Sequence, residues 1–205
     1  MQRGNIPAGN LFCPSLHILP VMRFDPAQVY QPEADTHLLL QAALAEFRPG
    51  DRVLEIGTGS GTIAAGLPGS VRVVATDINP HAAACAREKG LDVVRTDLLA
   101  GIRGTFDLIL FNPPYLPTQP DERIDDWLEH ALDGGESGRV VIERFATVVG
   151  QVLAPGGRIL LLISSLTGRE EVGILFTRAG FSSHEILRER IEGEDLMVLK
   201  IARVR

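Results

Sequence analysis

Cysteine and positive charge are both in short supply in this chain of 205 residues. Its two cysteines, Cys13 and Cys85, lie far apart and form no paired ligand motif. They therefore support neither a disulfide framework nor a zinc site, and we predict no bound metal. The net charge of -6 disfavours nucleic acid as the principal substrate, because proteins that bind a duplex usually carry a basic stripe.

Long hydrophobic runs are missing as well. No stretch approaches the roughly 20 apolar residues that a membrane helix requires, and the N-terminal region lacks a secretory pattern. We therefore expect a cytoplasmic protein with no membrane segment. Residues 1–22 are rich in glycine and proline, which predicts a flexible arm, and Met22 is hypothesised to be the natural start of translation. Residues 23–205 are predicted to form one domain.

Apolar patterning beyond the arm predicts strands and helices in alternation. This rhythm indicates an α/β fold with a mainly parallel sheet of seven strands and helices on both faces. We expect strands at 52–56, 71–76, 92–96, 106–111, 158–164, 182–190 and 195–203, and helices at 32–47, 60–67, 80–89, 138–153 and 169–179. The loop at about 113–136 is long enough to indicate function or flexibility.

The turn Asn112-Pro113-Pro114-Tyr115 follows the buried strand expected at 106–111. Prolines stiffen a turn just past the carboxyl end of a strand, which is where open α/β sheets bind their ligands. The Asn112 side chain and the Pro113 carbonyl offer two acceptor oxygens beside the Tyr115 ring. Such a set suits a planar NH2 group, and a purely structural proline turn is the weaker alternative. The turn therefore predicts chemistry at an amide or exocyclic amine nitrogen.

A glycine-rich turn connects the strand at 52–56 to the helix that follows it. Gly57, Gly59 and Gly61 allow a sharp turn and a close approach of the backbone to a ligand. A dinucleotide fingerprint has its third glycine at the position of Thr62, so this turn departs from that pattern. Glycines alone are a weak signal, and a tight structural turn is the alternative.

Acidic residues end the next two expected strands. Asp77 is placed to accept both hydroxyls of a ribose, or else to cap the following helix. Asp97 is placed to meet an adenine amino group with Leu98 under the ring, or else is a turn aspartate. With Glu55, these carboxylates lie at the ends of three neighbouring strands and indicate a nucleoside pocket for a cationic ligand. A sulfonium fits it better than a pyrophosphate, which calls for lysine or arginine.

These residues carry a resemblance to a known family. Glu55–Gly61, Asp77 and Asn112–Tyr115 resemble the class I S-adenosylmethionine-dependent methyltransferases that modify amino or amide nitrogens. The segment Val29–Thr36 resembles the V-Y-x-P-x-E-D-T signature of HemK-type glutamine methyltransferases in their archaeal and eukaryotic branch, with Ala34 in place of the glutamate. The loop Ala131–Arg139 and the last strand, Glu194–Lys200, are similar to the same branch. The likeness covers about residues 28–203.

The resemblance implies a fold, an activity and a set of site residues. The implied fold is a single Rossmann-like methyltransferase domain whose last strand is antiparallel. The family methylates the side-chain amide of the glutamine in the Gly-Gly-Gln loop of translation release factors. The implied cofactor-binding residues are Thr36, Glu55, Gly57, Gly59, Asp77, Asp97, Leu98 and Asn112. The implied substrate-binding residues are Asn112, Pro113, Pro114 and Tyr115, of which Asn112, Pro113 and Tyr115 are the catalytic ones.

A protein partner is implied at the strand expected at 92–96. This strand would form an edge of the sheet, and a short apolar edge invites pairing. Relatives in the archaeal and eukaryotic branch form a heterodimer with a small zinc-binding activator through that strand. An edge blunted by Asp92 and Arg95 is the alternative.

The sequence alone leaves two other functions possible. The same Asn-Pro-Pro-Tyr turn serves enzymes that methylate adenine or guanine amino groups in DNA or RNA, although the acidic balance argues against them. A nonenzymatic protein that binds S-adenosylmethionine is the second, and the intact Asn112 and Tyr115 argue against it. The chemistry of the Asn112–Tyr115 turn, together with the acidic charge, therefore favours methylation of an amide.

Overall fold

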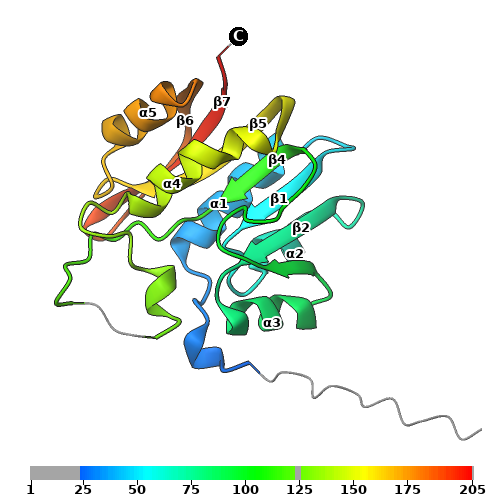
Figure 1. Ribbon diagram of the computed structural model, residues 1–205, viewed down its shortest axis with the longest axis horizontal. Helices are drawn as coiled ribbons and strands as arrows, with labels where there is room; N and C mark the ends of the chain where they lie inside the picture. Colours follow the sequence, from blue (N-terminus) through cyan, green and yellow to red (C-terminus); the bar gives the residue numbers. More distant parts are fainter. Residues whose placement is uncertain (1–23, 123–125, 205) are drawn as a thin grey trace, which may run out of the picture.

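The computed structural model describes residues 24–122 and 126–204. The predicted arm at 1–22 and the hypothetical start at Met22 lie outside the described residues. The strands are β1 (Arg52–Ile56), β2 (Arg72–Asp77), β3 (Asp92–Arg95), β4 (Phe106–Phe111), β5 (Leu153–Ser164), β6 (Phe181–Ile191) and β7 (Glu194–Arg203). They form one sheet in the order β3-β2-β1-β4-β5-β7-β6 (Figure 1). The pairs from β3 to β5 are parallel and β7 is antiparallel to both neighbours, which confirms the predicted sheet.

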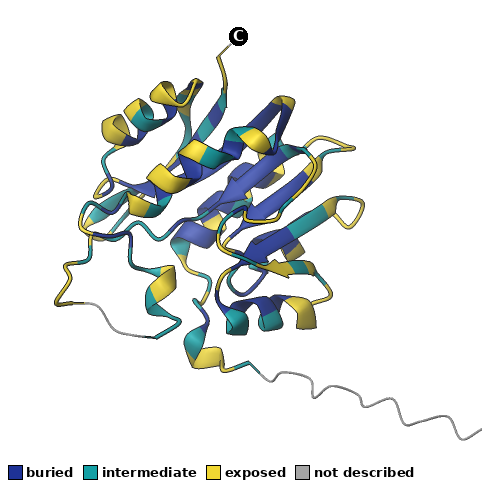
Figure 2. Cartoon of the chain, viewed as in Figure 1, coloured by how far each residue is buried: buried dark blue, intermediate teal, exposed yellow. Residues whose placement is uncertain are grey.

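Helices cover both faces of the sheet, as predicted. The α-helices are α1 (Ala34–Glu46), α2 (Thr62–Gly66), α3 (Pro80–Glu88), α4 (Val140–Val148) and α5 (Arg169–Arg178), and the 3-10 turns are η1 (Pro26–Gln28), η2 (Glu129–Ala131) and η3 (Val149–Gln151). α4 and α5 pack on one face through Phe145 and Phe176, and α1 and α2 on the other through Leu39 and Ile63. The central strands are consequently buried between them (Figure 2). Within the described ranges, no helix has the length and apolar character needed to cross a membrane.

The stretch Pro155-Gly156-Gly157 lies inside a strand rather than before it. We expected a helix over 138–153 and a strand that begins at Arg158, whereas β5 begins at Leu153. Phe106 of β4 pairs with Leu153, and the ladder resumes at Arg158 after an irregularity. The turn residues thus form a bulge that the neighbouring strand holds in the sheet, which a local sequence pattern does not reveal.

The carboxyl ends of β1 and β4 meet at one edge of the sheet, because the two strands are parallel neighbours. An ideal β-carbon on Gly57, just past β1, would lie 3.8 Å from the backbone oxygen of Asn112, just past β4. The fold therefore brings the glycine turn and the Asn-Pro-Pro-Tyr turn together from distant parts of the chain.

Candidate active site

The glycine turn at the tip of β1 forms one wall of the site. Gly57 and Gly59 have φ angles of 64° and 54°, which residues with a β-carbon rarely adopt. The Gly59 N–H donates a hydrogen bond to Oδ2 of Asp77 at 2.8 Å, and the Thr58 N–H donates to the Thr76 carbonyl at 2.9 Å. The turn is therefore tied to the end of β2, which joins two predicted cofactor segments.

Glu55 lies beneath the glycine turn and is 2% exposed. Its Oε2 accepts hydrogen bonds from the Thr58 hydroxyl at 2.9 Å and from the Ala64 N–H of α2 at 3.0 Å. Burial raises the pKa of Glu55 from 4.5 to about 8, although these two hydrogen bonds oppose the shift. The carboxyl group thus supports the turn from below and lines the cavity, and its contact with a cofactor stays a prediction.

Asp77, at the end of β2, is buried at 8% exposure. Its Oδ2 accepts from Gly59 and its Oδ1 accepts from the Asn79 N–H at 2.8 Å. Burial raises the pKa of Asp77, while the backbone N–H groups of Gly59, Asn79 and Ile78 counter that rise. The helix-cap alternative does not hold, because Asn79 caps α3 by accepting from the N–H groups of His81 and Ala82. A carboxylate has about four acceptor positions, so Asp77 retains capacity for a ligand hydroxyl.

Asp97 and Leu98 follow β3 at the rim of the site. Asp97 forms an ion pair with Arg144 of α4 at 2.5 Å, a contact that was not predicted. Leu98 has a φ of 48° and is the one non-glycine residue with a positive φ in the described part of the chain. Such a strained backbone persists only where its surroundings fix it, and it is often found at ligand sites. The contacts of both residues with an adenine ring remain predictions.

Asn112 presents one free oxygen. Its Nδ2 donates a hydrogen bond to Oδ2 of Asp35 at 2.9 Å. Its Oδ1 is buried and has no hydrogen-bond partner among the described residues, which is rare for a side-chain oxygen. Pro113, whose carbonyl also accepts no hydrogen bond in residues 24–122 and 126–204, is the next residue. Neither predicted acceptor is thus used by a donor of the described residues.

Two tyrosines lie beside this pair of acceptors. The Tyr30 hydroxyl donates to Oδ2 of Asp35 at 3.1 Å. Burial raises the pKa of Tyr30 and of Tyr115, and the nearby charge of Asp35 adds to both shifts. Both phenols consequently stay neutral at physiological pH. Tyr115 can therefore offer an uncharged ring next to Asn112, as the sequence predicts.

The loop Ala131–Arg139 holds the Asn-Pro-Pro-Tyr turn in place. The Leu116 N–H donates to the Leu132 carbonyl at 3.3 Å, and the Gly134 N–H donates to the Leu116 carbonyl at 2.9 Å. Gly138 has a φ of 68°, and a β-carbon there would lie 2.5 Å from the Tyr115 carbonyl oxygen. The resemblance in this loop therefore has a physical reason: the loop supports the Asn-Pro-Pro-Tyr turn.

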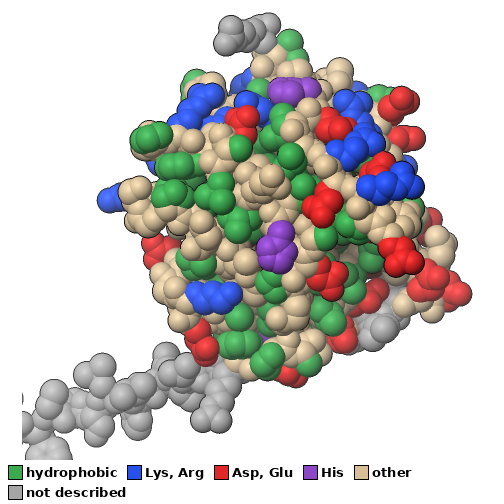
Figure 3. Space-filling view, turned by 180° about the vertical axis from the view of Figure 1, so that it is seen from behind, with side chains coloured by type: hydrophobic (Ala, Val, Ile, Leu, Met, Phe, Trp, Pro, Cys, Tyr) green, Lys and Arg blue, Asp and Glu red, His purple; other side chains and the backbone are tan. Residues whose placement is uncertain are grey.

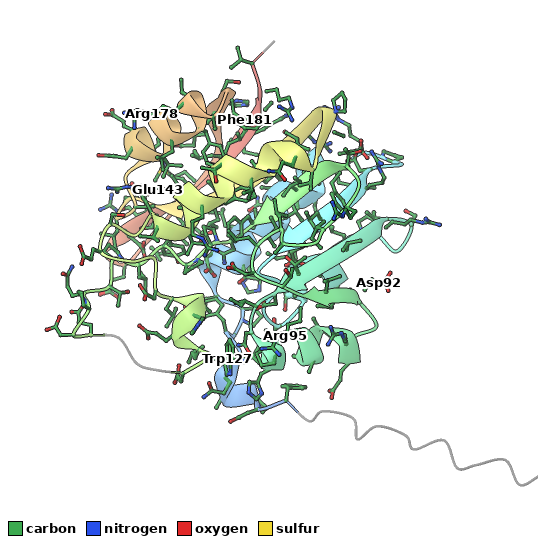
Figure 4. The ribbon with its side chains drawn as sticks, in the orientation of Figure 1. Asp92, Arg95, Trp127, Glu143, Arg178 and Phe181 are labelled. Carbon is green, nitrogen blue, oxygen red and sulfur yellow. The ribbon has the colours of Figure 1, made fainter. Side chains whose placement is uncertain are left out.

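The segment before Tyr30 and the loop before η2 meet beside the predicted cofactor residues. The Gln28 carbonyl accepts from Asn79 Nδ2 at 2.6 Å, and Gln28 Oε1 accepts from the Trp127 N–H at 2.9 Å. The Arg95 guanidinium lies over the Trp127 ring at 5.6 Å (Figure 4). The predicted edge strand is thus in contact with this loop.

All of these features surround one cavity of about 870 Å³. Its walls include all eleven predicted site residues, namely Thr36, Glu55, Gly57, Gly59, Asp77, Asp97, Leu98, Asn112, Pro113, Pro114 and Tyr115. None of them lines the smaller hollow of about 390 Å³ between Glu143, Arg178 and Phe181 (Figure 4). The large cavity has the size expected of a site that holds a nucleoside-sized cofactor and an acceptor side chain.

Several residues of the site were missed at the level of sequence. Asp35 and Tyr30 lie inside the Val29–Thr36 signature, so the motif contained them but gave them no role. Trp127 is the one tryptophan of the chain. It lies in the long loop at about 113–136, and the length of that loop was the only sequence feature that pointed to this region. Arg144 lies in the middle of α4, where nothing in the helical pattern distinguishes it.

The face opposite the view of Figure 1 carries basic and acidic side chains close together (Figure 3). Arg188 pairs with both Glu185 and Asp195, and Lys200 pairs with Glu46. Mixed charges of this kind form a solvated surface, unlike the basic stripe that binds a duplex.

The sheet order, the antiparallel β7, the glycine turn after β1 and the acid after β2 define a class I methyltransferase fold. The sequence profile of the methyltransferase small domain family matches residues 31–191, and the chain belongs to this family. The chain is therefore a methyltransferase, which confirms the predicted enzyme class.

Individual relatives indicate which members of this family the chain resembles. The chain is 40% identical to a candidate protein N5-glutamine methyltransferase of Methanocaldococcus jannaschii, over 86% of this chain and 93% of that protein. It is 36% identical to methyltransferase HEMK2 of Homo sapiens, over 86% of this chain and 91% of that protein. A solved E. cuniculi Mtq2–Trm112 complex, responsible for the methylation of the eRF1 translation termination factor, matches with a TM-score of 0.73 and 31% identity over 86% of this chain and 99% of that chain. The predicted resemblance to the HemK-type enzymes is confirmed.

Proposed function

We propose that the chain uses S-adenosylmethionine to methylate the N5 nitrogen of the glutamine in the Gly-Gly-Gln loop of a translation release factor. The observation that carries this proposal is the buried, unpartnered Oδ1 of Asn112 in the wall of the large cavity. The names of the relatives support a glutamine acceptor, and the E. cuniculi relative acts on a termination factor. A release factor as acceptor implies work in the cytoplasm, where translation ends.

The cavity walls fit the cofactor. Of the described residues that line the cavity, only Arg144 has a permanently positive side chain, and Asp97 already pairs with it. The walls therefore favour a cationic ligand over a phosphorylated one. Asp77 would accept the ribose hydroxyls, Leu98 and Asp97 would contact the adenine, and Thr36, Glu55 and the glycine turn would surround the rest. When bound, S-adenosylmethionine supplies a methyl group on a positively charged sulfur.

Asn112, Pro113 and Tyr115, which form the acceptor end of the cavity, would make an amide nitrogen a better nucleophile. The lone pair of an amide nitrogen is delocalised into its carbonyl group. Hydrogen bonds from its two N–H groups to Asn112 Oδ1 and to the Pro113 carbonyl would return electron density to the nitrogen. The Tyr115 ring favours the positive charge that develops there. Much of the rate then comes from holding the nitrogen in line with the methyl group.

A small zinc-binding activator protein is the partner that we assign to the β3 edge. β3 is the terminal strand of the sheet, and the Val94 side chain is 44% exposed there. Arg95 does not blunt this edge, because its side chain lies over Trp127 and donates to the Ile78 carbonyl at 3.3 Å. The Val93 carbonyl already accepts from Arg87 at 2.9 Å, so the contact with the partner would rest on exposed side chains such as Val94 rather than on that carbonyl. A partner at this edge is supported by the E. cuniculi relative, which was solved as a complex with Trm112.

Transfer of a labelled methyl group tests the proposed function. The wild-type chain, together with its activator, is offered a release factor, a single-stranded oligonucleotide or neither, and the labelled residue is identified by mass spectrometry. We expect label on the Gly-Gly-Gln glutamine alone. Label on a base, or on nothing, would overturn the proposal.

Asn112→Ala separates catalysis from binding in the same assay. Because Asn112 Oδ1 contacts the acceptor, turnover should fall at least about 100-fold while cofactor affinity stays within a few-fold. Asp107→Asn is the control: Asp107 pairs with Arg52 at the opposite end of β4, so its loss should leave turnover unchanged.

A further inference from the structure

Asp35 is a buried carboxylate that the proposed mechanism has not used. It lies in the first turn of α1, is 3% exposed, and forms no ion pair with a described lysine or arginine. Its Oδ1 accepts from the Thr36 N–H at 2.5 Å and from the Thr36 hydroxyl at 3.2 Å. Its Oδ2 accepts from Asn112 Nδ2 at 2.9 Å and from the Tyr30 hydroxyl at 3.1 Å. Each oxygen therefore has its own set of donors.

This arrangement decides which end of the Asn112 side chain points into the cavity. An ionised carboxylate accepts hydrogen bonds and has no hydrogen to donate. The nitrogen end of the Asn112 carboxamide must therefore face Asp35, and the oxygen end is left without a partner beside the cavity that Asn112 lines. A carboxamide turned the other way would oppose the NH2 group of the acceptor with a second NH2 group, and no hydrogen bond could form.

We propose that Asp35 is a positioning residue, which fixes the orientation of the Asn112 carboxamide so that its oxygen, and not its nitrogen, meets the acceptor NH2 group. This inference rests on the proposed function, in which Asn112 Oδ1 binds the acceptor. It adds that the acceptor half of the site is built by α1 as well as by the tip of β4.

Asp35→Asn is expected to invert the Asn112 carboxamide. The Thr36 N–H needs an acceptor and will retain the oxygen of the introduced side chain, so the introduced NH2 group takes the place of Oδ2 opposite Asn112. Asn112 must then turn its oxygen toward position 35 and its NH2 group toward the cavity. We expect kcat to fall about 100-fold, with the KM for S-adenosylmethionine changed less than about threefold.

An exchange of the two side chains distinguishes positioning from a structural role. Asn112→Asp alone places two carboxylates against each other, and kcat should fall at least about 100-fold. In the double variant Asp35→Asn/Asn112→Asp, the amide at position 35 donates to one oxygen of the carboxylate at position 112 and leaves the other oxygen for the acceptor. The double variant should therefore be at least about tenfold faster than either single variant. If Asp35 only stabilised the fold, the two defects would accumulate instead.

A second readout does not depend on the acceptor. In the wild-type chain with its activator, one hydrogen of the Asn112 NH2 group is bound to Asp35, so it should exchange slowly with water in NMR spectra of the ¹⁵N-labelled protein. In Asp35→Asn the NH2 group faces the cavity, and this slow hydrogen should exchange about tenfold faster. Asp107→Asn, the matched control outside the cavity, should leave both the exchange rate and kcat at the wild-type values.

The outcomes separate the two proposals. A wild-type enzyme that methylates no release factor would refute the proposed function, and the exchange measurement would still judge Asp35. An Asp35→Asn variant with wild-type kcat, a double variant no faster than the faster single variant, or an unchanged exchange rate would each overturn the role of Asp35.

Discussion

The α-carbon of Gly138 faces the carbonyl oxygen of Tyr115 so closely that a β-carbon would approach that oxygen to 2.5 Å. The oxygen belongs to the backbone, so no change of rotamer can relieve the contact. The two residues come from the two ends of the long connection between β4 and α4. Their close contact holds the Asn-Pro-Pro-Tyr turn against the far end of this connection.

Gly138→Ala should therefore lower both stability and turnover. Its φ of 68° is unfavourable for alanine, and the collision with Tyr115 adds to that strain, for a combined loss of about 2–4 kcal/mol in the free energy of unfolding. Gly180→Ala is the control, because its φ is 85° and no atom lies within 4 Å of a new β-carbon. Denaturant unfolding should show about 1 kcal/mol for the control, with normal turnover. Equal losses for both variants would contradict the contact.

Asp77→Ala should weaken cofactor binding before it affects the chemical step. The substitution removes the acceptor assigned to the ribose and also the tie between β2 and Gly59. Calorimetry should show affinity for S-adenosylmethionine at least about tenfold lower. Asp107→Ala removes a hydrogen-bonded carboxylate at the far end of the sheet and should leave affinity intact. Unchanged affinity in Asp77→Ala would count against the ribose contact.

Glu55 gives stability a defined dependence on pH. Because burial raises its pKa to about 8, the folded chain binds one more proton than the unfolded chain between about pH 4.5 and 8. This contribution to the free energy of unfolding is complete below about pH 4.5 and is lost as pH rises toward 8. Glu55→Gln, which stays neutral, should flatten that part of the profile, so the variant gains stability relative to the wild type at high pH. Glu170→Gln, on the exposed surface of α5, should leave the slope unchanged.

Val94→Lys should weaken the association with the proposed activator. It places a charge on the exposed edge of β3 and leaves the core intact, so the isolated chain should unfold as before. Binding measured by calorimetry should be at least about tenfold weaker. Ile174→Lys, at a 50% exposed apolar position on α5, is the matched control. Loss of binding in the control, or none in Val94→Lys, would move the partner away from β3.

The sequence was sufficient wherever a local pattern coincided with the final structure. β1 and β4 begin and end as predicted, because each is a short apolar run bounded by turn residues. The site at the carboxyl ends of the strands follows from parallel order, which places Gly57, Asp77 and Asn112 at one edge of the sheet.

The rest depends on contacts between residues that are distant in the chain. Asp35 and Asn112 are 77 positions apart, so no local pattern shows that one orients the other. The ion pair of Asp97 with Arg144 spans 47 positions in the same way. The early start of β5 depends on pairing with Phe106, and only the neighbouring strand could reveal it.

The segment formed by residues 24–28 is held by polar contacts, and none of the residues of η1 is buried. Gln28 joins it to Asn79 and Trp127 through two hydrogen bonds, each with a net value of about 1 kcal/mol. Separation of this segment disturbs neither core cluster. The segment can therefore open locally over the cavity while the sheet stays folded, which requires far less free energy than unfolding of the whole domain.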